Sequence, residues 1–523
     1  MDRKNKKDYW SALPFESNRL PLLGRSLIVG LFAGVVVSCF RLAIVLAEDT
    51  SFSVYEFVSG KPLLIVLLFV TLVATGYGIG RLIKALPMSN SSGIPQVKGL
   101  ITGHFDYSWW KILIAKFIGS NITTLGGLAF GREGPAIQLG GCVGQGVGKK
   151  FARTPSEKKM LIASGAAAGL GVALNAPIAG VMFAIEEIFK YFSPLILLCT
   201  MSAALAAQFV ASNIFGIEPI FHFDVVNNIP FSDLWLLIPM GIILGFGGVI
   251  YNYSLLKSQR VYKRIRRLPA VWRPVVPFLL AGVLGLIFPE VLCSGDIIMK
   301  NLDVSLSMKF LLLLLAVKFV FFVVCFGSGA PGGNLYPILV LGAIFGAIFG
   351  VFAVNQLGFA PELFANIVIL AMAGYFSAIA RTPITGIILL LEVTGSFQQL
   401  MPLAVVSLVA FVVADLLKSQ PIYEALLDAR VAEENPDPQL IEDKKQKTTV
   451  EMIVHHGSFA DGKLIKKLPL PGNCLIIGIK RGECCIIPHG DTRILPGDYL
   501  VVVTDQSGMA EAYVELTQMT SCK

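Results

Sequence analysis

Long apolar runs separated by short polar stretches occupy most of this chain. The first run, 27–46, is long enough to cross a bilayer, since a spanning helix needs about 20 apolar residues. Further apolar segments follow at 62–83, 109–126, 134–148, 159–190, 194–215, 234–256, 274–292, 308–328, 333–354, 364–378, 383–398 and 400–417. Many are broken by glycine or proline, which is tolerated at membrane depth only where the backbone is buried or lines an aqueous cavity. The pattern predicts an all-α polytopic membrane protein with broken and re-entrant helices.

The apolar region repeats itself at an offset of about 200 residues. Three blocks recur: 115–117 as 317–319, Gly131 with 135–140 as Gly333 with 337–342, and 175–180 before Glu186 as 381–386 before Glu392. Internal repeats with broken helices at matching positions are typical of transporters and indicate where the binding site lies. We place the repeats at about 25–215 and 231–425. The residues alone leave open whether the repeats are parallel or inverted.

Glutamates without a counterpart in the other half are candidates for function. Glu186 and Glu392 are counterparts of each other, so we expect both to fix a helix end or a hydrogen bond of the fold. Glu133 and Glu187 align with a leucine and a valine. An ionised carboxylate at mid-membrane costs a few kcal/mol, which favours a functional role for an acid found in one half only. A satisfied structural carboxylate remains the alternative for Glu187.

Glycine and proline predict three helix starts inside the apolar region. Residues 131–140 place Glu133 between glycines and ahead of a proline, which suits the first turn of a helix. Residues 92–95 and 327–337 have the same character, and Tyr423 offers a hydroxyl after the last apolar segment. A helix N-terminus attracts anions through unpaired N–H groups and the helix dipole. Each feature alone has an ordinary structural interpretation; together they predict an anion site in which Glu133 occupies the place of an anion.

The composition agrees with a membrane protein and argues against a soluble globular protein. Only 15% of the residues are charged, against about a quarter in soluble domains, and the mean hydropathy is +0.70. The net charge of +8 comes from short stretches such as 1–24 and 257–273, which we place in the cytosol by the positive-inside rule. The nine cysteines lack disulfide or zinc spacing. We expect a cell-membrane protein with both termini cytosolic that is not an enzyme and uses no cofactor, metal or nucleic acid.

The pattern changes after the last apolar segment. A charged, proline-containing linker is expected at 428–447, and alternating short strands predict a small cytosolic α/β domain at 448–523. We expect strands at 450–454, 474–479, 484–488 and 499–504, short helices at 462–468 and 509–517, and turns at 471–472, 481–482, 489–491 and 496–498.

Taken together, the motifs resemble the CLC family of chloride channels and proton-coupled chloride exchangers. The resemblance covers 25–427 and rests on Ser-Gly-Ile-Pro at 92–95, Gly-Arg-Glu-Gly-Pro at 131–135, Gly-Ala-Pro-Gly-Gly-x-x-x-Pro at 329–337 and Pro-x-Tyr at 421–423. It implies two inverted repeats and a homodimer with a separate pathway for chloride and protons in each subunit. We therefore expect a chloride/proton antiporter, with a passive voltage- or pH-gated chloride channel on the same fold as the alternative.

The resemblance also implies roles for single residues. Glu133 is implied to be the gating glutamate, and Glu187 the internal proton-transfer residue that exchangers carry and channels lack. The residues implied to hold chloride are Ser92, Gly93, Ile94, Leu335, Tyr336 and Tyr423.

Residues 448–523 resemble the TrkA-C domain of potassium-transport regulators. This resemblance implies ligand sensing or a dimer contact, with a small-molecule ligand that the sequence does not identify. The tail alone suggests a third function, a cation transporter or sensor. Helix N-termini repel cations, however, and no sequence for a carbonyl-lined filter is present.

Overall fold

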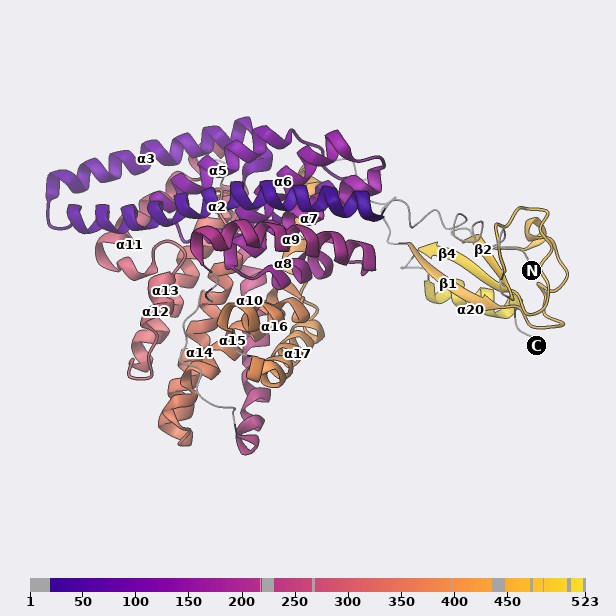
Figure 1. Cartoon of the computed structure of the whole chain (residues 1–523). Helices are drawn as coiled ribbons and strands as arrows, with labels where there is room; N and C mark the ends of the chain where they lie inside the picture. Colours follow the sequence, from indigo (N-terminus) through magenta and orange to yellow (C-terminus); the bar gives the residue numbers. More distant parts are fainter. Residues whose placement is uncertain are drawn as a thin grey trace, which may run out of the picture. The chain divides into compact units, whose positions relative to one another are not determined.

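The structure is a computed structural model that describes residues 19–216, 218, 230–265, 269–395, 397–434, 447–470, 474–482, 484–505 and 509–520. The chain divides into two compact units, Met1–Arg430 and Val431–Lys523. Figure 1 shows the helical first unit and the smaller second unit with its sheet. Each unit is described by itself below.

The first half of the larger unit contains a mixture of long and short helices. Their bounds are α2 (Arg19–Val58), α3 (Pro62–Ala85), η1 (Pro87–Ser89), α4 (Ile94–Thr102), α5 (Trp109–Leu125), α6 (Glu133–Phe151), α7 (Pro155–Leu174), α8 (Pro177–Phe183), the π-helical turn η2 (Ala184–Phe189) and α9 (Pro194–Phe215). The apolar segment 159–190 is therefore not one helix. Asn175 ends α7 in the left-handed region, with φ +50°, and Pro177 starts α8 two residues later.

The second half contains an equivalent series. Its elements are η3 (Phe231–Leu236), α10 (Leu237–Arg264), η4 (Ala270–Trp272), α11 (Val275–Ile287), η5 (Pro289–Val291), α12 (Asp296–Asn301), α13 (Met308–Gly327), α14 (Leu335–Leu357), η6 (Pro361–Leu363), α15 (Phe364–Ala380), α16 (Pro383–Thr394), η7 (Phe397–Gln399), α17 (Leu400–Leu416) and α18 (Ile422–Glu434). The predicted loop 257–273 is partly wrong, because α10 continues to Arg264; 266–268 lie outside the described residues. The start of the predicted linker is likewise helical, since α18 runs to Glu434.

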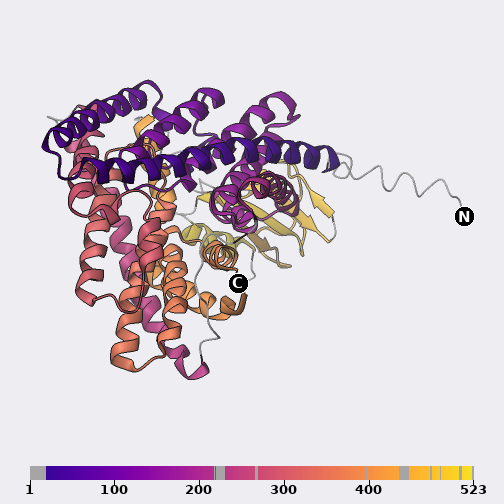
Figure 2. The same ribbon diagram turned by 60° about the vertical axis from the view of Figure 1, so that its left-hand side comes forward.

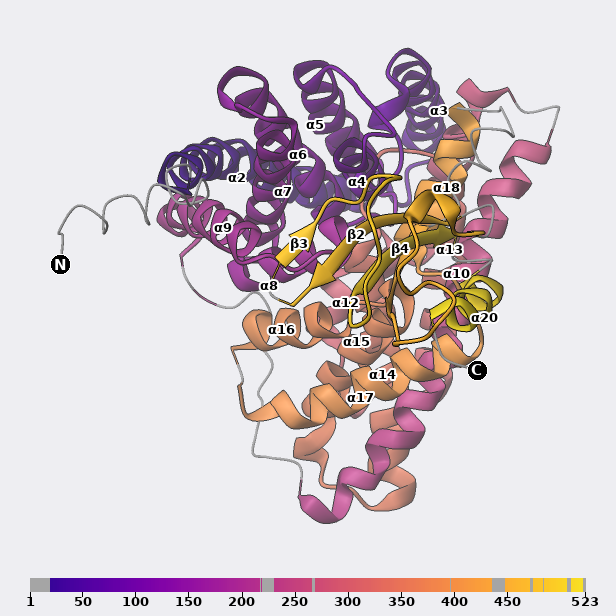
Figure 3. The ribbon, with the colours of Figure 1, turned by 90° about the vertical axis from the view of Figure 1, so that its right-hand side faces the viewer.

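The two halves pack their helices in the same way. In the first half α6 packs on α7 and α2 packs on α9; in the second half α14 packs on α15 and α10 packs on α17. Figures 1 and 2 show the halves as two groups, coloured indigo to magenta and pink to orange. The short helices α8 and α16 of the two groups lie against each other (Figure 3). The sequence repeat is thus also a repeat of packing.

Glu186 and Glu392 join the halves at this contact. The Glu392 carboxylate accepts the N–H of Ala179 at 2.7 Å, at the start of α8, and the Glu186 carboxylate accepts the N–H of Thr385 at 2.7 Å, at the start of α16. Each acid satisfies N–H groups at the first turn of a helix in the opposite half, where a negative charge is favoured. The prediction that the paired glutamates fix helix ends is confirmed.

Several helices are suited to a membrane. Among the described residues, nine helices are long and apolar enough to cross one. The span Pro361–Ala380 is the most enclosed of the nine, with 94% of its most apolar 18-residue stretch buried inside the protein, whereas Pro62–Ala85 has 28% of the equivalent stretch buried. α15 is therefore a central helix, and α3 presents most of its apolar surface outward, as expected for a lipid-facing helix.

The smaller unit is an antiparallel sheet with one helix packed on it. The strands β1 (Lys447–Ile453), β2 (Leu475–Arg481), β3 (Cys484–Ile486) and β4 (Tyr499–Asp505) pair in the order β1-β4-β2-β3, and α20 (Met509–Thr520) packs on β1 and β4. The four predicted strands and the last helix are confirmed. The predicted helix 462–468 is wrong, because only the 3-10 turn Ile465–Lys467 forms there. The predicted turn 471–472 lies outside the described residues.

Candidate anion site

Three helix starts meet in the larger unit. They belong to α4, α6 and α14, and Gly134 lies at the point of contact. A Cβ atom built on Gly134 would lie 2.7 Å from the carbonyl oxygen of Ser92 and 3.0 Å from the Cα of Gly333. Gly131 and Gly333 exchange two backbone hydrogen bonds, of 2.9 and 2.8 Å. The three glycine- and proline-rich segments found in the sequence therefore form one site.

Glu133 is the first residue of α6 and is completely buried. Its carboxylate lies over Gly131, beside Tyr336 and Pro337 of α14. The backbone N–H groups of Glu133 and Tyr336 face the carboxylate, but neither of its oxygens accepts a regular hydrogen bond from the described residues. An ionised carboxylate is expensive to bury without such bonds. Glu133 thus stands where the helix starts of α6 and α14 attract negative charge.

Ser92, Gly93 and Ile94 form the start of α4. Ser92 is completely buried, and its Oγ accepts the N–H of Ile94 at a long 3.4 Å. Gly93 is the N-cap with φ +95°, and a Cβ there would lie 2.7 Å from the Cβ of Gln138. Only glycine fits this left-handed position beside α6.

Tyr423 reaches the site from α18. The side chain is completely buried, its ring stands edge-on to Phe183 at a centroid distance of 5.8 Å, and its hydroxyl has no hydrogen-bond partner within the described ranges. The hydroxyl lies within electrostatic range of both Glu133 and Glu187. Tyr423 is therefore buried close enough to both acids for their charges to act on its hydroxyl.

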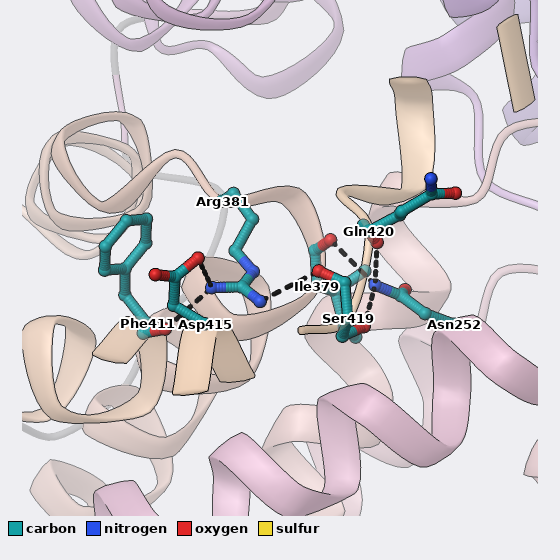
Figure 4. Close-up of polar contacts among 7 residues, drawn as sticks. All are labelled: Asn252, Ile379, Arg381, Phe411, Asp415, Ser419 and Gln420. Carbon is teal, nitrogen blue, oxygen red and sulfur yellow. Dashed lines mark hydrogen bonds and ion pairs between the residues drawn. The ribbon is translucent and has the colours of Figure 1, made fainter. Parts of the chain in front are cut away.

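Two side chains that the sequence analysis missed hold the segment just before Tyr423 (Figure 4). Asn252 of α10 donates to the carbonyl oxygen of Gln420 at 3.0 Å, and Arg381 at the end of α15 donates to the carbonyl oxygen of Ser419 at 3.0 Å. Figure 4 shows them approaching this segment from opposite sides. The available signal was a polar residue inside an apolar helix, for Asn252, or directly after one, for Arg381, since such a residue is costly to bury without a partner.

Glu187 lies in the π-helical turn η2 and is 1% exposed. Its Oε1 forms an ion pair of 2.7 Å with the Nζ of Lys98, which is 4% exposed and belongs to α4. Glu187 is thus a paired carboxylate in this conformation. Lys98 was not predicted as a site residue, although a lysine in the short apolar helix after Ile94 was a visible signal.

Comparison with known proteins gives the family. The voltage gated chloride channel family model matches residues 73–415, and the TrkA-C domain model matches 449–517. The H(+)/Cl(-) exchange transporter ClcA of Vibrio cholerae is 34% identical over 415 residues, which cover 77% of this chain and 88% of that protein. ClcA of Salmonella arizonae is 32% identical over 439 residues, which cover 80% and 90%.

Solved structures agree. A slow cyanobacterial Cl-/H+ antiporter matches with a TM-score of 0.75 and 29% identity, covering 79% of this chain and 99% of that one. A CLC-type fluoride/proton antiporter matches with a TM-score of 0.66, but at 23% identity it supports the fold alone. The predicted fold class, an all-α polytopic membrane protein with two inverted repeats and a small α/β C-terminal domain, is confirmed. With the family model matching more than half of its length, the chain belongs to the voltage gated chloride channel family, the CLC family, and carries a TrkA-C domain at its C-terminal end.

Proposed function

We propose that this protein is a secondary active antiporter that exchanges chloride for protons. The observation that carries the proposal is the position of Glu133, a buried carboxylate without regular hydrogen bonds where three helix starts meet. Such helix starts attract anions, so chloride and the ionised side chain compete for one place. The names of the relatives, H(+)/Cl(-) exchange transporters, support the same function.

Competition at this place couples the two ions. Ionised, Glu133 occupies the anion position; protonated, it loses its attraction to the helix starts, swings away and carries its proton while chloride enters. Each helix dipole contributes roughly 0.3–2 kcal/mol, so converging helix starts add up to a substantial preference for negative charge. Glu187 exchanges the proton with the cytosol, and a transient water chain past Tyr423 connects the two acids. The residues that hold chloride are Ser92, Gly93, Ile94, Leu335, Tyr336 and Tyr423.

The chain is a multi-pass membrane protein, and we place it in the cell membrane with both termini in the cytosol. The transmembrane domain spans 25–427 between an N-terminal segment, 1–24, and the linker at 428–447. We further propose a homodimer with one pathway per subunit, and a regulatory domain at 448–523 that binds a small molecule or forms a dimer contact. Transport follows the ion gradients, so the protein needs neither cofactor nor enzymatic activity.

Liposomes containing the purified protein test this function. Under a chloride gradient, the wild type is expected to move protons against their own gradient, with a reversal potential that depends on both ions. Glu133→Ala and Glu187→Ala should abolish proton movement, while Glu187→Ala still passes chloride. Glu362→Ala, at an exposed glutamate of η6, is the matched control and should behave as wild type. A wild-type reversal potential set by chloride alone would identify a passive chloride channel instead.

A further inference from the structure

On the basis of the antiport proposed above, we propose that Lys98 is a two-position switch for the proton-transfer site. Its ammonium lies on Glu187 while that carboxylate is ionised, and moves to Glu424 when Glu187 takes up a proton. Lys98 is a positioning residue in this scheme, because it neither carries the transported proton nor contacts chloride.

Both carboxylates lie within reach of the Lys98 ammonium. The Nζ of Lys98 lies 2.7 Å from Oε1 of Glu187 and 4.0 Å from Oε1 of Glu424. Lys98 belongs to α4, which packs on η2, the turn that carries Glu187, while Glu424 belongs to α18. A rotation of the lysine side chain is therefore enough to exchange one carboxylate for the other, with no movement of a helix.

Burial makes the second position necessary. The Lys98 side chain is 6% exposed, and a buried ammonium left beside a neutral acid loses its compensating charge, which is strongly destabilising. Glu424 is available to accept it. Its side chain is 37% exposed and paired with Lys190, which is 41% exposed. Ion pairs exposed to this degree contribute little, so Lys190 can leave Glu424 to water at low cost.

The other charged groups around Glu187 come from η2 and α18. Lys190 lies at the end of η2, and Glu424 comes from α18. Asp428, one turn further along α18, lies within electrostatic range of Lys98, His104 and Glu424. These groups together shape the response to cytosolic pH, but among the described residues Lys98 is the cation that forms a direct ion pair with Glu187.

The switch also changes the electrostatic potential along the proposed chloride path. Glu424 follows Tyr423 directly, in the first turn of α18, where its carboxylate offsets the positive pole of that helix. Asn252 and Arg381 fix the preceding segment (Figure 4), so α18 provides a fixed platform. Glu424 stays paired through the switch, first with Lys190 and then with Lys98, while the proton on Glu187 removes one negative charge from this group. Proton uptake at Glu187 thereby strengthens the attraction for chloride at the inner end of the path.

Transport in liposomes at varied internal pH tests the switch, with protein oriented so that the cytosolic side is known. Lys98→Met removes the ammonium and should move the cytosolic pH of half-maximal antiport about one unit to the alkaline side, because the ionised carboxylate loses its partner. Lys98→Arg keeps the charge and should restore the wild-type profile. Lys190→Met, the matched control, should shift the profile by less than half as much. Glu424→Gln removes the second position and should slow turnover at least fivefold with the chloride:proton ratio unchanged.

The outcomes separate this proposal from the antiport itself. If the wild type pumps no protons, the proposed function fails. If the wild type pumps and Lys98→Met has the wild-type pH profile, or Lys190→Met shifts it equally, the switch is wrong and the antiport stands. If Lys98→Met does not fold, Lys98→Arg and Glu424→Gln test the proposal in its place. A pH profile of Lys98→Arg that differs from wild type, or wild-type turnover in Glu424→Gln, overturns the switch.

Discussion

Lys116 and Lys318, equivalent residues of the two halves, are both completely buried, and each ammonium lies on three successive backbone carbonyl oxygens. Lys116 holds residues 89–91, with 3.2 and 3.3 Å to the first two, and Lys318 holds 291–293 at 2.9, 3.5 and 2.9 Å. The last residue of each triplet has a positive φ, +49° at Ser91 and +52° at Cys293. Each lysine thus stabilises a loop of the same conformation in its own half of the protein.

The two loops differ in the residue that starts the next helix. The position of Ile94 in α4 is taken in α12 by Asp296, which accepts a hydrogen bond from the Tyr336 hydroxyl. An acid in the first turn of α12 occupies the place that an anion favours. The fold therefore builds this type of helix start in both halves, with an acid in the first turn of α12 and none in the first turn of α4.

Removing the two lysines should separate stability from ion binding. Lys116→Met and Lys318→Met each leave buried carbonyl oxygens without donors, so both should lower the free energy of unfolding by about 3 kcal/mol. Only Lys116→Met should also weaken chloride binding, at least tenfold, because only its loop leads into Ser92. Thermal unfolding in detergent and calorimetric chloride titration measure the two effects. Equal loss of chloride affinity in both variants would contradict this assignment.

Alanine at Gly134 should disturb the meeting point of the three helix starts. The added Cβ meets backbone atoms of Ser92 and Gly333 at 2.7 and 3.0 Å, which cannot give way as a flexible side chain does. We expect a loss of about 1–3 kcal/mol in stability, and loss of transport. Gly78→Ala in α3 is the control, since nothing lies within 4 Å of its new Cβ. It should instead stabilise the helix by up to about 1 kcal/mol. Urea unfolding measures whether each substitution lowers or raises the stability, and chloride flux measures whether transport is lost.

The parts of the site that were predictable from sequence are those encoded locally. Glycine and proline mark a helix start wherever they occur, so the segments around Ser92, Glu133 and Leu335 were visible without a structure. The repeat then indicated that Glu186 and Glu392 are structural residues, because each is the counterpart of the other, and their hydrogen bonds to helix starts in the opposite half confirm it.

The remaining features depend on contacts between distant segments. The ion pair of Lys98 with Glu187 exists because α4 packs on η2, and no local pattern indicates that packing. The same holds for Asn252 and Arg381, which hold the segment before Tyr423 from two other helices. The bounds of α2, Arg19–Val58 against the expected 27–46, were missed because charged residues near its ends do not stop a helix that packs against other helices.

Replacing Asn252 should loosen the position of Tyr423 without removing a residue proposed to hold chloride. Asn252→Leu keeps the size of the side chain but leaves the carbonyl oxygens of Ile379 and Gln420 without their donor. We expect a cost of about 1–2 kcal/mol and a chloride affinity lowered about threefold to tenfold. Asn121→Leu is the control, because its amide donates to Phe117, one turn earlier in its own helix α5. Titration with chloride in detergent measures the affinity of both variants. Equal chloride affinities of Asn252→Leu and Asn121→Leu would show that Asn252 does not position Tyr423.

Asp498 makes the stability of the C-terminal domain depend on pH. Arg481 Nε and Nη2 donate to its two carboxylate oxygens at 2.8 Å each, and the N–H of Leu495 donates at 2.8 Å. Burial alone would raise the pKa of Asp498, but these hydrogen bonds and the guanidinium charge lower it below its ordinary value. A carboxyl group with a lowered pKa in the folded state stabilises the fold above its unfolded pKa, near 3.9, and this stabilisation is lost as the pH falls through the folded value.

The contribution of Asp498 to the stability of the domain should therefore stay constant from pH 7 to about 5, and about 1–3 kcal/mol should be lost on further acidification. Hydrogen exchange of the β1 and β4 amides, measured in the full-length protein and corrected for intrinsic rates, follows this loss. Asp498→Asn should lower protection at neutral pH and flatten the acid dependence, since the variant has no proton to gain. Asp491→Asn is the control, because that side chain is 81% exposed and its pair with Lys466 lies in solvent. Protection in Asp498→Asn that still falls with acid as in the wild type would assign the dependence to another carboxylate.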